Sequence, residues 1–267
     1  FIALLIAWSL ASGYFPAVYE GLPKTTYWWM GIVGAIGLFF SIVFHELSHS
    51  LVARRYGIQI KGITLFIFGG VAEMESEPTS PVGEFMMAIA GPLSSLVLAG
   101  FFYVLSSIGQ SAGVPAALFG TLSYLAYFNV IIAIFNMVPA FPLDGGRVFR
   151  AILWYRSGDI RRATQIASRA GVTFGYVLMA LAVVNIISGN FLVGLWWFLI
   201  GIFVQNAAAA HYQRLRMRRV LKGQSIADFM SRETVSDSPD ITITDLVENS
   251  IYQTHHKLYP VVDGSHL

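Results

Sequence analysis

The sequence predicts an α-helical polytopic membrane protein with about six transmembrane helices, a short membrane-associated β-hairpin and a small α/β cytoplasmic segment at the C-terminus. Three observations predict this class. Of the 267 residues, 55% are hydrophobic and only 12% are charged, whereas a soluble domain carries about 25% charged residues. Six apolar stretches approach the roughly 20 residues that a helix needs to cross a bilayer. Basic residues gather on one side of these stretches.

The six candidate spans are separated by connections that differ in charge. The spans are residues 1–19, 27–53, 83–107, 115–138, 163–187 and 191–210. Lys and Arg gather on one side of them, in residues 54–61, 147–169 and 214–222. The opposite side carries only Lys24. By the positive-inside rule, this asymmetry predicts that both termini lie in the cytoplasm. We expect a multi-pass integral protein of the cell (inner) membrane.

The composition also limits the chemistry. There is no cysteine, which excludes disulfides, thiolate metal sites, Cys nucleophiles and iron–sulfur clusters, so a metal must be held by His, Asp or Glu. The formal net charge of +2 gives no electrostatic footprint for nucleic acid, and we expect no nucleic-acid partner. The chain opens with Phe1 inside an apolar run, and we expect it to continue before this residue.

The second span carries ionisable residues, which a bilayer makes costly. His45 and His49 are four residues apart, so both imidazoles lie on one helix face and can share a metal. Glu46 lies beside that metal, placed to take a proton from water. The alternative, a pair of hydrogen-bonded core histidines, would desolvate three polar groups without purpose. Since His45 precedes Arg54 by nine residues, the site lies about 13 Å into the membrane.

The fourth span supplies the best candidate for a third ligand. Two prolines interrupt it after Asn136, and Asp144 follows them. Gly145 and Gly146 are expected to let the backbone turn away after Asp144. Because this span also runs toward the cytoplasm, Asp144 should reach the depth of His45. Two imidazoles and a carboxylate with one open position suit zinc, although an ordinary loop turn at Asp144 is the alternative.

Asn136 has two interpretations of its own. Its amide can hold a substrate backbone or an oxyanion, or it can cap the carbonyls of the broken helix. Residues 58–75 are β-branched and aromatic around two glycines. They predict a hairpin that dips into the membrane and offers an edge to an extended peptide, or else a plain amphipathic connection. Gly91 and Pro92 interrupt the third span, either for close helix packing or to make room for the active site.

Composition changes sharply after the last span. Residues 211–224 form a basic juxtamembrane linker, which is either a solvated flank or a site for anionic lipid. Residues 225–267 are mixed and soluble in character. Thr242 and Asp245 predict a capping box that opens a helix over 243–253. A segment of about 40 residues does not sustain its own core, so we expect it to be truncated or completed by a partner.

The motifs of the membrane part resemble the site-2 protease family of intramembrane zinc metalloproteases. The resemblance covers residues 1–224, with the protease core over 1–210. It rests on the sequences His45-Glu46-Leu47-Ser48-His49, Asn136 to Gly146 (the pattern Asn-x-x-Pro-x-x-Pro-x-Asp-Gly), Gly69-Gly70 and Ala90-Gly91-Pro92. A six-span topology is also what this subgroup of the family implies.

The resemblance implies a role for each motif residue. His45, His49 and Asp144 would ligate one Zn²⁺ per chain. Glu46 would be the general base, and Asn136 would contact the substrate or its tetrahedral intermediate. The implied activity is that of a zinc endopeptidase that cuts within or near the transmembrane helix of membrane-anchored regulatory proteins, after another protease has trimmed them.

Residues 225–267 resemble the first part of a cystathionine-β-synthase (CBS) motif, on the sequences 226–230 and 259–264. The site-2 protease family has a CBS-bearing subgroup, so the two resemblances support each other. CBS motifs work in pairs, and the resemblance implies an adenine nucleotide at a completed module and a homodimer through the CBS segments.

Two other functions stay open at this point. A nucleotide-regulated channel or transporter would use the same His, Glu and Asp residues as an ion path, but it does not require a Glu inside the His pair. A catalytically silent scaffold would need a closed coordination shell. Four further glutamates lie in a connection that we expect to be wet: Glu73, Glu75, Glu77 and Glu84.

Overall fold

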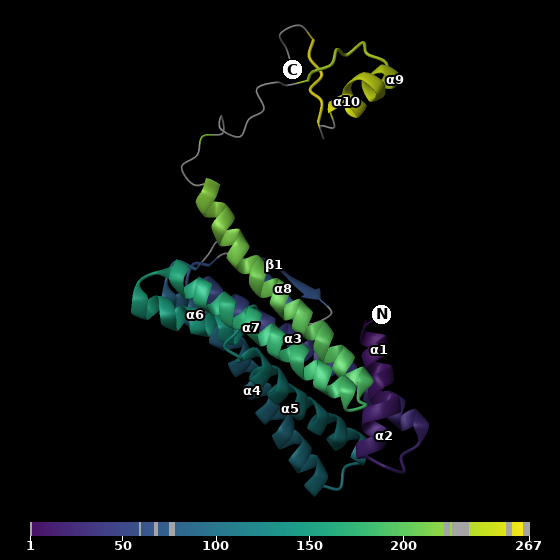
Figure 1. Ribbon diagram of the computed structural model, residues 1–267. Coiled ribbons are helices and arrows are strands. Elements are labelled where there is room, and N and C mark those ends of the chain that lie inside the picture. The colour runs from purple at the N-terminus through teal and green to yellow at the C-terminus, as the bar shows by residue number, and fades with distance from the viewer. Residues whose placement is uncertain are drawn as a thin grey trace. The chain divides into compact units, whose positions relative to one another are not determined.

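The computed structural model describes residues 2–58, 60–66, 69–74, 78–221, 225, 235–254 and 258–263. The chain divides into two compact units, Phe1–Arg216 and Met217–Leu267. Figure 1 traces the elements of both units in chain order.

The first unit consists of helices and one two-stranded sheet (Figure 1). Its elements are α1 (Ile2–Ser9), the π-helix η1 (Leu10–Tyr14), α2 (Phe15–Val18), α3 (Lys24–Arg55), β1 (Ile60–Phe66), β2 (Gly69–Met74), α4 (Pro81–Ser111), α5 (Ala116–Asn136), α6 (Asp144–Ser157), α7 (Ile160–Ile187) and most of α8 (Phe191–Leu221). Residues 217–221 at the end of α8 belong to the second unit. The long apolar helices of the first unit agree with the predicted membrane class.

Five helices in the described part of the chain are long and apolar enough to cross a membrane: α3, α4, α5, α7 and the Phe191–Ala210 part of α8. They correspond to five of the six predicted spans. The predicted first span corresponds to a shorter apolar stretch, Ala3–Val18, and a sixth crossing there stays a prediction. Large apolar side chains such as Val97 and Ile134 are exposed on these helices, as lipid-facing residues are.

Small residues let the membrane helices approach one another closely. A Cβ atom on Gly37 of α3 would lie 2.7 Å from Leu125 of α5. On α7, a Cβ on Gly175 would lie 2.8 Å from the carbonyl oxygen of Gly201 on α8. Figure 1 shows α4 with α5, and α7 with α8, as hairpins of antiparallel helices. α4 also packs against both α3 and α6. The positions of α3 and α6 relative to each other therefore depend on how each of them packs against α4.

Two antiparallel strands lie in the segment for which a hairpin is one of the expectations. The pairing runs from Phe66 opposite Gly69 to Ile60 opposite Met74, with an irregularity between Ile60 and Gly62. Residues 59, 67, 68 and 75–77 lie outside the described residues. Within the described part of the chain the sheet has these two strands, so each strand has an outer edge.

The break after α5 brings the chain to the start of α6. α6 begins at Asp144, directly after an irregular segment, residues 137–143. The prediction that the chain turns away at Gly145 and Gly146 is wrong, because both glycines lie in the first turn of α6. A Cβ on Gly146 would lie 2.5 Å from the backbone nitrogen of Phe141. The glycines therefore let the irregular segment fold back tightly against the beginning of the helix.

The juxtamembrane residues continue α8 as a helix as far as Leu221. This is consistent with the high helix propensity of Arg, Leu and Met. Residues 222–224 lie outside the described residues, so the extent of the predicted linker stays a prediction.

In the second unit, α9 (Ile243–Asp245), the π-helix η3 (Leu246–Ile251) and α10 (Tyr252–Thr254) follow one another as one helical stretch. The Thr242 hydroxyl accepts a hydrogen bond from the backbone N–H of Asp245 over 3.2 Å, which confirms the predicted cap. Asp237 forms an isolated parallel bridge with Val261. Residues 226–234 and 264–267, which carry much of the CBS resemblance, lie outside the described residues.

Candidate metal centre

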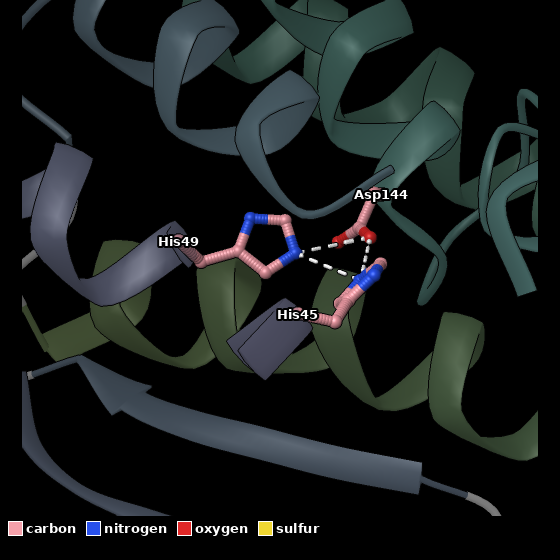
Figure 2. A group of neighbouring side chains, drawn as sticks. All are labelled: His45, His49 and Asp144. Atoms are coloured by element: carbon pink, nitrogen blue, oxygen red, sulfur yellow. Dashed lines mark hydrogen bonds and ion pairs between the residues drawn. The ribbon is translucent and has the colours of Figure 1, made fainter. Parts of the chain in front are cut away.

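Two helices that are distant in the sequence bring three candidate ligand side chains together. His45 and His49 lie one turn apart on α3, and Asp144 is the first residue of α6 (Figure 2). The Asp144 Oδ2 atom lies 3.0 Å from His45 Nε2 and 3.1 Å from His49 Nε2. The two Nε2 atoms are 3.2 Å apart. These three atoms form a nearly equilateral triangle, so one small ion can contact all of them.

The dimensions of the triangle suit zinc. Tetrahedral zinc with bonds of about 2.0–2.1 Å places its ligand atoms roughly 3.3 Å apart, close to the 3.0–3.2 Å seen here. Both histidines are buried, and the Asp144 side chain is 15% exposed. Among the described residues the group has three members. A tetrahedral ion would therefore keep one open position, which is the arrangement of catalytic zinc sites.

Helix α4 makes a polar contact with the Nδ1 atom of each imidazole. His49 Nδ1 donates a hydrogen bond to the Met87 carbonyl over 2.7 Å. Because a carbonyl only accepts, the neutral ring keeps its Nε2 lone pair free for a metal. His45 Nδ1 lies 2.9 Å from the hydroxyl of Ser95, which is fully buried. Sequence reasoning missed both partners: Ser95 could have been noticed as a hydroxyl inside an apolar span, whereas a backbone carbonyl leaves no signal.

Gly91 lies between these two contacts on the same face of α4. A Cβ atom at this position would lie 2.6 Å from His45 Nε2 and 2.5 Å from His49 Cε1, which leaves no space for any side chain. Two interpretations were open for the Gly91-Pro92 interruption, and the contacts of Gly91 support the one in which it makes room for the site. Pro92 lies inside α4, where it removes one backbone N–H from the helix ladder.

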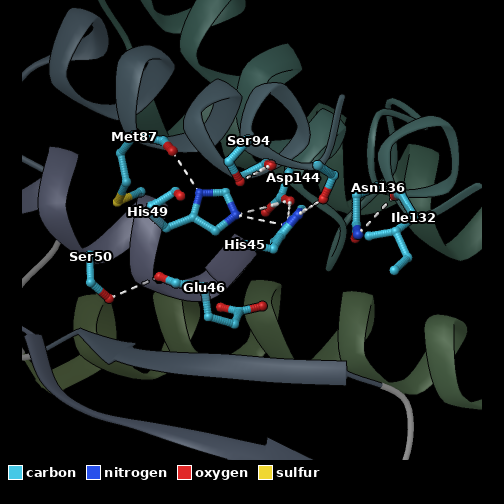
Figure 3. Close-up of polar contacts among 12 residues, drawn as sticks. His45, Glu46, His49, Ser50, Met87, Ser94, Ile132, Asn136 and Asp144 are labelled. Carbon is cyan, nitrogen blue, oxygen red and sulfur yellow. Dashed lines mark hydrogen bonds and ion pairs between the residues drawn. The ribbon is translucent and has the colours of Figure 1, made fainter. Parts of the chain in front are cut away.

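Glu46 lies beside the three candidate ligand residues. Its carboxylate is half-buried and close enough to interact electrostatically with His49 and Asp144. Figure 3 shows the Glu46 side chain next to the group, with the Met87 and Ser94 contacts on the other side in this view. The structure therefore brings the predicted general base to the predicted ligands.

The Asn136 side chain bonds its own helix. Its amide donates a hydrogen bond over 3.1 Å to the carbonyl of Ile132, one turn earlier on α5 (Figure 3). This contact agrees with the interpretation in which Asn136 caps a carbonyl of the broken helix. In this conformation the amide nitrogen is engaged by its own helix rather than by the three ligand residues.

The expectation that Glu84 lies in a wet connection is wrong. Glu84 lies in α4 with no exposed surface. Arg150 of α6 donates from Nε to Glu84 Oε1 over 2.7 Å, and its Nη2 atom donates to the same oxygen. A carboxylate can be buried in this way because the guanidinium compensates its charge and supplies hydrogen bonds. Composition alone shows neither the partner nor the burial.

The fold and the site together define a multi-pass integral membrane protein with a candidate metal centre between α3 and α6. The model of peptidase family M50 matches residues 33–120 and 107–181. The chain belongs to peptidase family M50, and the predicted membership of the site-2 protease family is confirmed.

Several relatives support this membership. Rip3 of Mycobacterium tuberculosis is 36% identical over 98% of this chain and 66% of its own length. The zinc metalloprotease MJ0392 of Methanocaldococcus jannaschii is 33% identical over 86% of this chain and 64% of its own length. The chain thus spans slightly less than two thirds of these curated relatives. A solved site-2 protease from Methanocaldococcus jannaschii has a TM-score of 0.53 at 30% identity, covering 79% of this chain and 88% of that one.

Proposed function

We propose that this chain is the catalytic core of an intramembrane zinc endopeptidase. The observation that carries the proposal is the convergence of His45, His49 and Asp144 around one point, with Glu46 beside them. Family membership supports the same conclusion. Bound zinc would supply a Lewis acid that polarises the scissile carbonyl and acidifies the attacking water.

The other chemical steps belong to side chains of this chain. Glu46 accepts a proton from the attacking water and passes it to the leaving amine. Asn136 holds the substrate or the charge that develops on its carbonyl oxygen. To do so, the amide exchanges its hydrogen bond with Ile132 for one with the substrate.

The proposed substrates are membrane-anchored regulatory proteins, cut within or near their transmembrane helix. A helix hides its carbonyls, so the substrate must first unwind. An outer edge of the β1–β2 hairpin, dipping into the membrane, replaces the lost helical hydrogen bonds with β-sheet bonds. Proline substitutions in residues 63–72 should then impair cleavage of helical substrates more than zinc binding. Equal loss of both would contradict this part of the proposal.

The proposal also has a topological and a regulatory part. Both termini lie in the cytoplasm, as the distribution of Lys and Arg predicts. The membrane that holds the protein is the cell (inner) membrane. Residues 225–267 form part of a CBS module, which binds an adenine nucleotide and pairs with a second copy of the chain when complete. These statements rest on the sequence, and each stays a prediction.

The two other functions are less well supported. A channel or transporter is not favoured, because the family is one of peptidases and an ion path does not require Glu46. A silent metal scaffold would need a fourth protein ligand, and the group found among the described residues has three.

The test measures zinc and cleavage on the same preparations. Wild-type protein and the isosteric variant Glu46→Gln are purified in detergent, zinc per chain is determined, and each is incubated with single-span membrane peptides. We expect about one zinc in both, and cleavage by the wild type that is at least 10²-fold faster than by the variant. A His45→Ala variant should lose the zinc. Zinc in both proteins with no cleavage by either would contradict the proposal, and ion flux in liposomes would then test the transport alternative.

A further inference from the structure

A buried ion pair joins α4 to α6 close to the metal centre. Glu84 has no exposed surface, and Arg150 is 4% exposed. Two nitrogens of the Arg150 guanidinium donate to Glu84 Oε1. The third, Nη1, lies 3.4 Å from the hydroxyl of Thr164 on α7. The guanidinium carbon also lies 5.2 Å from the centre of the Phe141 ring. Arg150 thus ties α6 to α4, to α7 and to the segment that precedes α6.

The residues of α4 that contact the site follow one another along a single helix face. Glu84, Met87, Gly91 and Ser95 are spaced by three, four and four residues, which is the spacing of one face. The last three contact the imidazoles of α3. The first holds α6. One face of α4 therefore contacts both the two histidines of α3 and the helix α6, which begins with Asp144.

Stability alone is a poor reason for a buried ion pair. Replacing such a pair with apolar residues of similar volume is often neutral or stabilising, whereas directional bonds fix how two elements meet. Metal sites tolerate shifts of only about 0.2 Å in their ligand distances. Arg150 lies six residues after Asp144, about 9 Å along α6, so a slip of this helix against α4 would carry the carboxylate away from the imidazoles.

We propose that Glu84 and Arg150 are positioning residues, which set where Asp144 meets His45 and His49. This inference rests on the proposed function, because it assumes that the three residues bind a metal. If the pair had a purely structural role, a variant that folds normally would keep its Zn²⁺ affinity. If the pair positions Asp144, the affinity of such a variant should fall.

The experiment compares a single and a double variant of the full chain in detergent. Glu84→Gln leaves Arg150 as a buried, uncompensated charge, so it should lower both the thermal stability of the metal-free protein and its affinity for Zn²⁺. The double variant Glu84→Gln with Arg150→Met removes the buried ion pair but leaves Arg147, which also interacts electrostatically with Glu84, so it should recover part of that stability. Its Zn²⁺ affinity should stay about 10- to 100-fold below wild type, as for lost partners of metal ligands.

Two readouts report the metal without relying on cleavage. Competition against a chromophoric chelator gives the Zn²⁺ affinity, and the visible absorption of the Co²⁺-loaded protein reports the ligand geometry. The matched control is Ser106→Ala near the other end of α4, which removes hydrogen bonds to the Phe119 carbonyl and to Ser123. This variant should keep wild-type Zn²⁺ affinity and an unchanged Co²⁺ spectrum.

A double variant with wild-type Zn²⁺ affinity and Co²⁺ spectrum would overturn the inference alone, since the pair would then only balance charge. Loss of affinity to the same extent in Ser106→Ala would also overturn it, because any weakening of α4 packing would then have this effect. Wild-type protein that binds neither metal would overturn the proposed function and the inference with it.

Discussion

Replacing Gly91 with Ala should weaken zinc binding severely while leaving the fold intact. The new Cβ would lie 2.6 Å from His45 Nε2 and 2.5 Å from His49 Cε1, whereas ordinary van der Waals contact begins at 3.4 Å. His45 Nε2 must therefore move by 0.8 Å to reach ordinary contact, and His49, whose Nε2 atom lies closer still to the new Cβ than its Cε1, must move by more than 0.9 Å. The atoms that move are the ends of side chains, so the backbone of α3 need not follow.

The expected loss follows from the tolerance of a metal site. Ligand distances in such sites hold to about 0.2 Å, and a misplacement of 1 Å can cost about 10²-fold in activity. We expect zinc affinity to fall by at least about 10²-fold. The metal-free protein should still fold, because the gain of about 1 kcal/mol in helix propensity from Gly to Ala offsets part of the roughly 1–3 kcal/mol that overpacking costs.

A matched control lies on the same helix. Gly100 of α4 has nothing within 4 Å of its Cβ position, so Gly100→Ala brings the same gain in helix propensity without touching the imidazoles. Zinc affinity is measured by chelator competition, and stability by thermal unfolding of the metal-free proteins. Equal zinc affinities in the Gly91→Ala and Gly100→Ala variants would refute the reasoning, since the Cβ would then have found space that the structure does not show.

Three further predictions concern the site and the helix packing. Ser95→Ala removes the hydroxyl beside His45 Nδ1 and should lower zinc affinity about 10-fold or more, whereas Ser94→Ala, whose hydroxyl bonds a carbonyl of its own helix, should leave it unchanged. A chelator should stop peptide cleavage, zinc should restore it, and circular dichroism should show the helices unaltered throughout; loss that zinc does not reverse would count against a simple metal requirement. Gly175→Leu places a side chain against the backbone of Gly201 and should destabilise the α7–α8 hairpin by about 1–3 kcal/mol, seen as a lower unfolding temperature than that of Gly100→Leu.

The parts of the fold and site that depend on local patterns could be predicted. Five spans follow from apolar length, and the four-residue spacing of His45 and His49 places both rings on one face of any helix. Asp144 needed a further argument, that two spans running toward the same side end at a similar depth. That argument identified the residue, although the helix it begins was not foreseen.

The parts that depend on contacts between helices could not be predicted. Glu84 and Arg150 are 66 residues apart, and each alone resembles an ordinary charge near the end of a span. The contact of His49 with the Met87 carbonyl could not be predicted from the residue type, because every residue carries a backbone carbonyl. The Ala3–Val18 stretch is apolar like the five longer helices, and composition does not show that it is interrupted by η1.

The sequence distance within the metal centre has a consequence for synthesis of the chain. His45 and Asp144 are 99 residues apart, so at about 5–20 residues per second the carboxylate is made roughly 5–20 s after the first imidazole. During this interval the growing chain has two of the three proposed ligands and no α6 to dock. A chain arrested before residue 144 would therefore lack the third proposed ligand, and in the proposed site zinc binding would follow the docking of α6 against α3 and α4.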